Sequence, residues 1–264
     1  MTSRTLLITI NVHGTGPEAA RAPGTTLYGR DAHGRYSYGD GLARLLDMLK
    51  RQNILATFFW PVYEAEQTGA LLQRCLHEGH EIASHGYAFE DLATLDQDGQ
   101  AELLERARDR LTALTGTRPA GFRQTWGGFT ERTLPLLSAL GYRYDSSAID
   151  DDMPYSLAQD GGGDMIELPW SEGLCDATHF SRRATQQRAR DHFDEQANAL
   201  LDVAGYACLT LHPRADYGVG RAARLVMVED LLGKLREGGA HYATCSDIAT
   251  ATHRAHSLSA IDNT

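Results

Sequence analysis

The chain has 264 residues, enough for one large α/β domain or two small ones, and its 42% hydrophobic and 23% charged residues are typical of a globular protein. Its 25 basic and 35 acidic residues give a formal charge of −10, so the chain repels polyanions and we expect no nucleic-acid partner. The 4 cysteines form no Cys-x-x-Cys pair, which argues against a zinc knuckle or a disulfide framework and favours a reducing compartment.

The beginning of the chain does not resemble a secretory signal. The apolar run 5–10 is too short for the hydrophobic part of a signal peptide, and polar Asn11 follows it. No stretch approaches the roughly 18 apolar residues of a membrane span. We therefore expect a cytoplasmic protein that does not contact membranes.

Short apolar runs alternate with helical patterns along most of the chain. The β-branched run 5–12 predicts a buried strand, and the Gly-, Arg- and Tyr-rich stretch 14–41 predicts a long loop that covers a site. The pattern then predicts helices at 41–51, 70–78, 100–115, 130–140, 185–203 and 222–237, and strands at 54–60, 81–84, 119–123, 143–145, 166–169, 207–211 and 241–245. This alternation predicts one α/β domain over residues 1–254, most simply a parallel barrel, and we expect residues 255–264 to be a frayed tail.

Polar side chains recur where the predicted strands end. Because the carboxyl ends of barrel strands meet at one face, we expect these side chains to form the site. Imidazoles there can serve as general acids or bases or bind a divalent metal, and the residue types alone leave both roles open. The residues are Asn11, His13, His85, Arg123, Asp145 and His212.

Short motifs follow one another in a fixed order. They are NVHG at 11–14, ATFF at 56–59, GHEIASHGY at 79–87, GFR at 121–123, LGYRYDSS at 140–147, ELP at 167–169 and LTLHP at 209–213. In this order and spacing the chain resembles the polysaccharide deacetylase (NodB homology, carbohydrate esterase family 4) superfamily over roughly residues 5–250. It looks most like the intracellular branch with a peptidoglycan deacetylase, deacetylase-type allantoinases and cyclic-imide hydrolases. The resemblance implies a distorted, TIM-like (β/α)7 barrel.

The family's metal-site positions carry unusual residues here. Members of the superfamily typically have an aspartate base and an aspartate metal ligand in the first motif, and two histidine ligands in the second. Asn11 stands at the base position and His13 at the ligand position, while His85 is present and Phe89 replaces the second histidine. An amide has no useful basicity and a phenyl ring cannot coordinate a metal.

The resemblance thus leaves His13 and His85 as metal ligands, whereas a catalytic zinc usually has three from the protein. Glu90 or Asp91 is a candidate third ligand, although nothing in the pattern points either one inward. We therefore expect either no cofactor or one divalent metal, such as zinc, with ligands unlike those of the family.

The later motifs imply the remaining site residues. His212 matches the catalytic acid, and Arg123 matches the arginine that orients active-site carboxylates. With the base aspartate gone, we expect Arg123 to face a substrate carboxylate or imide oxygen. The expected substrate contacts are Asp145, Trp126, Trp170, Glu172, Asp176 and Phe89, with Asp150, Asp151 and Asp152 near the rim of the pocket.

Three functions remain open from the sequence. The first is hydrolysis of a non-peptide carbon–nitrogen bond in a small molecule, an N-acyl group, ureide or cyclic imide, with His212 as acid and His13 or His85 activating water. The second is non-hydrolytic acid–base chemistry on the same barrel, an isomerisation, epimerisation or elimination that tailors a metabolite. The third is an inactive homologue that binds a ligand, and a homo-oligomer is also possible.

Overall fold

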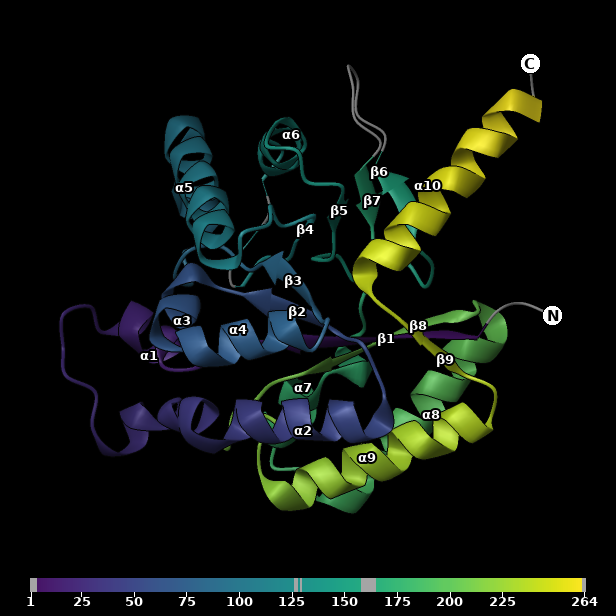
Figure 1. Ribbon diagram of the computed structural model, residues 1–264, viewed down its shortest axis with the longest axis horizontal. Coiled ribbons are helices and arrows are strands. Elements are labelled where there is room, and N and C mark those ends of the chain that lie inside the picture. The colour runs from purple at the N-terminus through teal and green to yellow at the C-terminus, as the bar shows by residue number, and fades with distance from the viewer. Residues whose placement is uncertain (1–3, 126–127, 129, 158–164, 263–264) are drawn as a thin grey trace.

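One curled β-sheet, wrapped by helices, organises the molecule (Figure 1). The computed structural model describes residues 4–125, 128, 130–157 and 165–262. Its strands are β1 (Thr5–Asn11), β2 (Thr57–Trp60), β3 (Glu81–Ser84), β4 (Gly121–Phe122), β5 (Tyr144–Asp145), β6 (Tyr155–Leu157), β7 (Met165–Glu167), β8 (Tyr206–Leu211) and β9 (His241–Ala243). They run in the order β6-β7-β5-β4-β3-β2-β1-β8, with β9 beside the first half of β1, and the pairs are parallel except β6 with β7.

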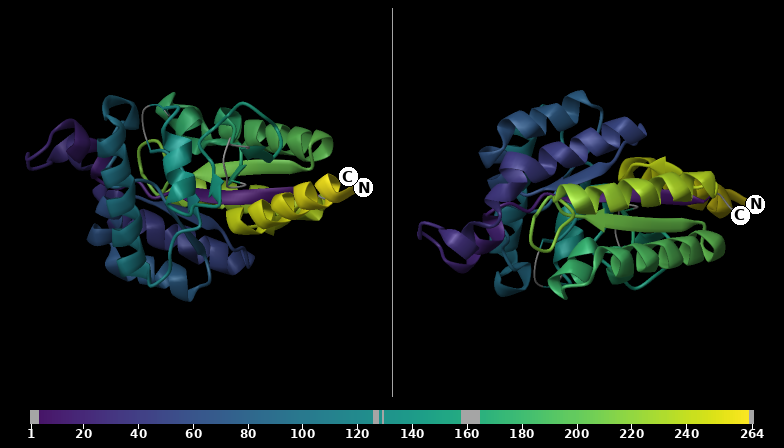
Figure 2. Two further views of the ribbon diagram at one scale, coloured as in Figure 1. Left: turned by 90° about the horizontal axis from the view of Figure 1, so that it is seen from above. Right: turned by 90° about the horizontal axis from the view of Figure 1, so that it is seen from below.

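Helices cover the outside of this sheet. They are α1 (Gly16–Arg21), α2 (Leu42–Gln52), α3 (Val62–Gln67), α4 (Gly69–His77), α5 (Gln97–Thr115), α6 (Thr133–Ala139), α7 (Asp176–Ser181), α8 (Gln186–Val203), α9 (Ala222–Glu237) and α10 (Cys245–Asp262). Figure 2 shows α2, α9 and α8 side by side on one face. Within the described part of the chain, none of the helices is both long enough and apolar enough to span a bilayer.

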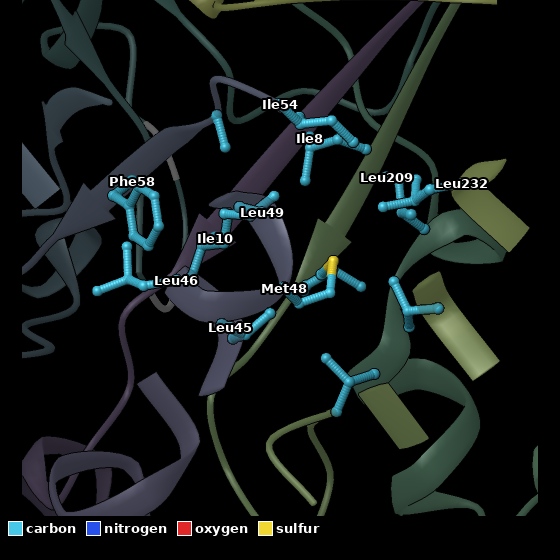
Figure 3. Packing of buried hydrophobic residues seen from close by; sticks show 14 of the residues in the cluster. Ile8, Ile10, Leu45, Leu46, Met48, Leu49, Ile54, Phe58, Leu209 and Leu232 are labelled. Atoms are coloured by element: carbon cyan, nitrogen blue, oxygen red, sulfur yellow. The ribbon is translucent and has the colours of Figure 1, made fainter. Parts of the chain in front are cut away.

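Strand β1, which pairs with β2, β8 and β9, contributes side chains both to the outer core and to the inside of the sheet, because alternate residues of a strand point to opposite faces. Ile8 and Ile10 are fully buried and pack on the leucines of α2, as Figure 3 shows. Each such isoleucine contributes roughly 1.5–3 kcal/mol through burial. Leu7 and Thr9 point inward instead, and Asn11 follows on that same inner side. The strand that builds the core therefore also directs polar groups into the centre of the barrel.

The predicted α/β barrel is confirmed as a curled half-barrel. The two end strands of the sheet, β6 and β8, do not pair with each other within the described residues. Past β7, however, Cys175 forms a single parallel bridge with Thr210 of β8. This bridge brings the segment before α7 against the last long strand. The carboxyl ends of β1, β3, β4 and β8 consequently surround one centre.

Several local predictions were wrong. The stretch 14–41 is not only a loop, since it contains α1, a 3₁₀ turn at Gly29–Ala32 and a π-helical turn at Ser37–Gly41. Two six-residue helices, α3 and α7, and the short strand β6 were not predicted, because segments of this length show too little periodicity. The expected frayed tail is helical through Asp262, since neither Gly nor Pro interrupts α10 (Figure 1).

Candidate active site

Four strand ends bring together most of the polar residues singled out in the sequence. Asn11 is the last residue of β1 and His13 lies just beyond it, while His85, Arg123 and His212 directly follow β3, β4 and β8. The ring centroids of His13 and His212 are 4.8 Å apart, and Nε2 of His13 is 3.1 Å from Nε2 of His85. Asn11 and His13 keep partial solvent exposure. The structure thus brings five of the six polar strand-end residues to one centre.

Arg123 fills the inside of the barrel and does not face a substrate as expected. It is 2% exposed, and its Nη1 donates to Asn11 Oδ1 at 3.1 Å and to Thr9 Oγ1 at 3.0 Å. Its Nε and Nη2 donate to the backbone oxygen and hydroxyl of Ser146 at 2.8 and 2.7 Å. The guanidinium also stacks 4.1 Å from the ring of Phe59. With its donors directed at protein groups, Arg123 orients Asn11.

The partners of His212 decide which of its ring nitrogens carries the proton. Because Arg123 holds the oxygen of Asn11, Nδ2 of Asn11 faces His212 Nε2 at 3.3 Å. An amide nitrogen only donates, so Nε2 accepts and keeps its lone pair. Nδ1 carries the hydrogen and donates to Asp176 Oδ1 at 2.6 Å. His212 is therefore a neutral imidazole whose lone pair points into the site.

Asp176 was expected to contact substrate, and this prediction was wrong. Its side chain is fully buried, and its Oδ2 accepts the backbone N–H groups of His212 at 2.8 Å and Val219 at 3.0 Å. Asp176 begins α7, so the bridge between Cys175 and β8 places this carboxylate under His212. The residue is the hydrogen-bond partner of the imidazole.

A second hydrogen-bonded chain passes through His13 and His85. The backbone carbonyl of Arg123 can only accept, so His85 Nδ1 donates to it at 2.7 Å. Burial lowers the pKa of His85 to about 3, which keeps its Nε2 bare and able to accept the hydrogen of His13 Nε2. His13 Nδ1 then accepts the hydroxyl of Tyr217 at 3.0 Å.

His13 is held neutral as well. Burial lowers its pKa well below the usual range, and the neighbouring His212 and His85 lower it further. In this chain both nitrogens of His13 and of His85 already have partners. These contacts span 2.7–3.1 Å, whereas Nε2 of His212 faces the amide nitrogen of Asn11 at the longer distance of 3.3 Å.

Buried charges that the sequence reasoning missed hold the segment after β1. Glu64, on the unpredicted helix α3, accepts the backbone N–H groups of Gly14 and Gly16 at 2.8 Å each, and the hydroxyl of Tyr38. Burial raises the pKa of Glu64 to about 7. A Cβ at Gly14 would lie 2.1 Å from the ring of Tyr38, so only glycine fits there.

Arg214 clamps the other side of this segment. Its guanidinium makes two hydrogen bonds to Glu18, at 2.9 and 2.6 Å, and a third to the carbonyl of Gly14 at 2.6 Å. It also lies 4.6 Å above the ring of Tyr217. Arg214 therefore helps to fix the position of Tyr217, whose hydroxyl contacts His13. No motif in the sequence indicated this clamp, because its members are almost 200 residues apart.

Phe89 stands beside His13 as a packed wall. Its ring meets the imidazole edge-on with centroids 4.8 Å apart, and it is 7% exposed. Its φ of 68° is in the left-handed region, which is costly for an aromatic residue and persists only where packing enforces it. A Cβ on Gly16 would come 2.2 Å from this ring, so Phe89 is enclosed on both sides.

The residues present do not fit the expected metal site. His13 and His85 aim their Nε2 atoms at each other, but the expected third ligands are turned away. Glu90 accepts the N–H of Ala88 at 2.7 Å, and Asp91 accepts the N–H groups of Ala93 and Gly128.

A second possible donor group is the buried set Cys175, Asp176 and His212. Both oxygens of Asp176 already accept hydrogen bonds, one of them from His212 itself. Burial also raises the pKa of the Cys175 thiol to about 12, which keeps it protonated, whereas metals bind the thiolate. This group therefore suits a hydrogen-bond relay better than a metal ion.

The remaining expected contacts lie elsewhere. Asp145 is fully buried and accepts the N–H and hydroxyl of Ser147. Its carboxyl group lies beside that of Glu167, and burial raises the pKa of both. Trp170 and Glu172 line a cavity of about 270 Å³ near the beginning of β8, together with Asp151 and Asp152. This cavity lies towards the opposite end of β8 from His212. Trp126 lies outside the described residues.

Fold and site together define an α/β half-barrel with a histidine-rich centre. Residues 36–144 match the family model of polysaccharide deacetylases. A protein from Mycobacterium smegmatis assigned to the polysaccharide deacetylases superposes with a TM-score of 0.86 at 28% identity, over 97% of this chain and 92% of that one. Over residues 36–144 the chain is thus similar in sequence to the polysaccharide deacetylases, and almost its whole length has the fold of a solved protein described as one.

Two further relatives extend this comparison. The peptidoglycan deacetylase of Helicobacter pylori is 30% identical over 116 residues, which cover 44% of this chain. The match spans only 40% of the length of that protein. Puue allantoinase has the same fold, with a TM-score of 0.83 over 97% of this chain and 92% of its own, at 22% identity.

Proposed function

We propose that this protein hydrolyses a non-peptide carbon–nitrogen bond in a small molecule, an N-acyl group, a ureide or a cyclic imide. The observation that carries the proposal is the arrangement of Asp176, His212 and Asn11. It presents an unprotonated imidazole nitrogen that accepts from the amide of Asn11, with a buried carboxylate at the other ring nitrogen. These are the parts that acyl transfer to water requires: a base, a donor for the developing oxyanion, and a group that stabilises the imidazolium.

In this proposal His212 acts first as base and then as acid. Its Nε2 removes a proton from the attacking water, and the resulting imidazolium is stabilised by Asp176, 2.6 Å from Nδ1. When water takes the place of Asn11 at Nε2, the amide of Asn11 is released to donate to the oxygen of the tetrahedral intermediate. The proton on Nε2 then passes to the leaving nitrogen, so the bond breaks without forming a free amide anion.

Asn11 thus takes a different role from the aspartate that the resemblance places there. Nη1 of Arg123 holds the amide oxygen at 3.1 Å, so the two N–H bonds of Asn11 point into the site. A preorganised side-chain amide of this kind contributes roughly 3–4 kcal/mol to transition-state stabilisation in known oxyanion holes. The roles first expected for His13 and His85, water activation or metal binding, fit less well. All four nitrogens of these two imidazoles already form hydrogen bonds with protein groups.

The relatives support the reaction class. The Helicobacter pylori relative is a peptidoglycan deacetylase, whose reaction cleaves an N-acyl bond, and the neighbour of similar fold is an allantoinase. Both act on carbon–nitrogen bonds outside peptides. No step proposed here passes through a metal ion.

A substrate panel with three variants tests the proposal. Allantoin, succinimide and an N-acetylglucosamine oligomer are assayed for release of the open-chain or deacetylated product. We expect wild-type turnover of one class, a loss of at least about 10³-fold in His212→Ala, and little change in His77→Ala, an exposed histidine on α4. Unchanged turnover in His212→Ala would refute the mechanism. Solvent deuterium incorporation without bond cleavage would instead support the non-hydrolytic alternative.

Metal analysis of the same preparations provides an independent readout. We expect clearly less than one zinc per chain in active wild-type protein, because His13 and His85 face each other and the expected third ligands, Glu90 and Asp91, accept backbone N–H groups instead. Stoichiometric zinc that is lost in His13→Ala would contradict this part of the proposal.

A further inference from the structure

A second cavity, distinct from the histidine centre, lies where α7 turns into α8. Its volume is about 610 Å³, within the range of small-molecule sites. Cationic and imidazole side chains dominate its lining, with one carboxylate. These residues are Arg182, Arg183, Arg188, His179, His192 and Glu172.

The three arginines of this cavity have no acidic partner. In the part of the chain that the structure describes, no carboxylate pairs with the guanidinium of Arg182, Arg183 or Arg188, all of which are exposed. Arg190, two residues after Arg188 on α8, does have an acidic partner: its Nη2 lies 3.3 Å from Oδ1 of Asp191. In a chain with a net charge of −10, this cavity is a local concentration of uncompensated positive charge.

The backbone sets the positions of these arginines. Arg183 adopts a φ of 58°, and the N–H groups of Arg183 and Ala184 donate back to Phe180 and His179 at 3.1 Å each, which ends α7 sharply. Thr185 then caps α8 by accepting the N–H of Arg188 at 3.2 Å. The turn therefore places two arginines directly before the first turn of an 18-residue helix and a third within it.

The two histidines fix the opposite wall. Nε2 of His179 lies 2.9 Å from the carbonyl of Gly173 and donates to it, and its ring centroid is 4.9 Å from that of His192. A Cβ on Gly173 would approach His192 Nε2 to 3.3 Å, so the wall is closely packed at this point. The basic residues thus surround a shaped cavity and are not scattered over a flat surface.

We propose that this cavity binds the phosphoryl group of a small phosphorylated ligand. Guanidinium groups match phosphate oxygens with paired N–H donors, and the first turn of α8 adds a favourable dipole. The net negative charge of the whole chain disfavours a nucleic-acid backbone, which would have to approach a much larger surface. This proposal is independent of the hydrolytic function, since none of these residues touches His212.

Calorimetric titration with inorganic pyrophosphate at low ionic strength tests the proposal on the full chain. We expect saturable binding that the double variant Arg182→Gln/Arg188→Gln weakens at least about tenfold, since each removes a guanidinium from the phosphate. The matched control Arg190→Gln should bind within about twofold of wild type, because its guanidinium pairs with Asp191. His212→Ala should also bind normally, which separates this site from the hydrolytic centre.

Three outcomes would overturn the proposal. They are the absence of saturable pyrophosphate binding, an equal loss in Arg190→Gln, and tighter binding of a single-stranded DNA oligonucleotide than of pyrophosphate. Circular dichroism spectra of all variants establish that they are folded. Arg183→Gln provides a second variant should the double substitution unfold the turn.

Discussion

Replacing Asp176 by Asn gives the sharpest test of how protons are arranged around His212. The two backbone N–H groups, of His212 and Val219, require an acceptor at the Oδ2 position, so the single oxygen of the new amide will remain there. Its NH₂ group then faces Nδ1 of His212, where the carboxylate now lies at 2.6 Å. Two donors cannot face each other, so the imidazole must move its hydrogen from Nδ1 to Nε2.

This tautomer has two costs. The hydrogen on Nε2 meets the amide N–H of Asn11, whose nitrogen is 3.3 Å away, and the lone pair needed to deprotonate water is lost. A comparable substitution in a serine-protease triad lowers kcat about 10⁴-fold, so we expect a loss of about 10³- to 10⁴-fold. Loss of a buried, charge-assisted hydrogen bond should also lower the free energy of unfolding by about 1.5–3 kcal/mol.

The assay measures kcat on the substrate identified by the panel, together with urea unfolding. Asp191→Asn, which changes an exposed carboxylate on α8, is the matched control and should retain wild-type kcat. A folded Asp176→Asn protein with kcat within about threefold of wild type would refute the assignment of His212 as base and the tautomer on which it depends.

Two further substitutions test the groups around this centre. Tyr217→Phe removes the hydroxyl that donates to His13 Nδ1 and leaves a buried acceptor without its donor. We therefore expect the free energy of unfolding to fall by about 1–3 kcal/mol. An unchanged free energy of unfolding would contradict the hydrogen-bond chain through His13. Glu64→Gln tests a pH effect. Burial raises the native pKa of Glu64 from 4.5 to about 7, so its stabilising contribution is complete below about pH 4.5 and is lost as the pH rises through 7. At about 1.4 kcal/mol per pKa unit, the unfolding free energy of the wild type should fall relative to the variant by roughly 3 kcal/mol between pH 4.5 and 8, and a constant difference would contradict it.

The strand ends could be predicted because their signal is local. Each short apolar run ends in a polar residue, and the geometry of parallel sheets brings such residues together whatever their distance in sequence. Asn11, His13, His85 and His212 were found in this way. Asp145 also ends a strand, yet it is fully buried. The sequence did not predict this burial, because a strand of two residues is too short for its alternation to show which side chain points inward.

The contacts of the supporting residues could not be predicted, although Asp176 itself was among the expected site residues, because their partners are distant in sequence. Asp176 lies 36 residues before His212 and meets it only through the bridge between Cys175 and Thr210. Glu64 lies on a six-residue helix, which is too short to show a helical period in the sequence. The ion pair of Arg214 with Glu18 depends on the segment 14–41, which the sequence pattern predicted only as a long loop. These contacts depend on tertiary structure, and no single-sequence pattern records them.

Asn11 does more than remove a base from the site. A carboxylate at position 11 would accept from both Arg123 and His212, and would thereby hold the imidazole hydrogen on Nε2. The amide offers only one acceptor, and Arg123 takes it at 3.1 Å, so the donor end must turn to His212 and the lone pair must lie on Nε2. Exchanging one oxygen for NH₂ thus turns His212 from a donor into an acceptor, while the buried arginine determines which end of the amide it meets. In the proposed mechanism the base function therefore passes from position 11 to His212, whose Nδ1 lies 2.6 Å from Asp176.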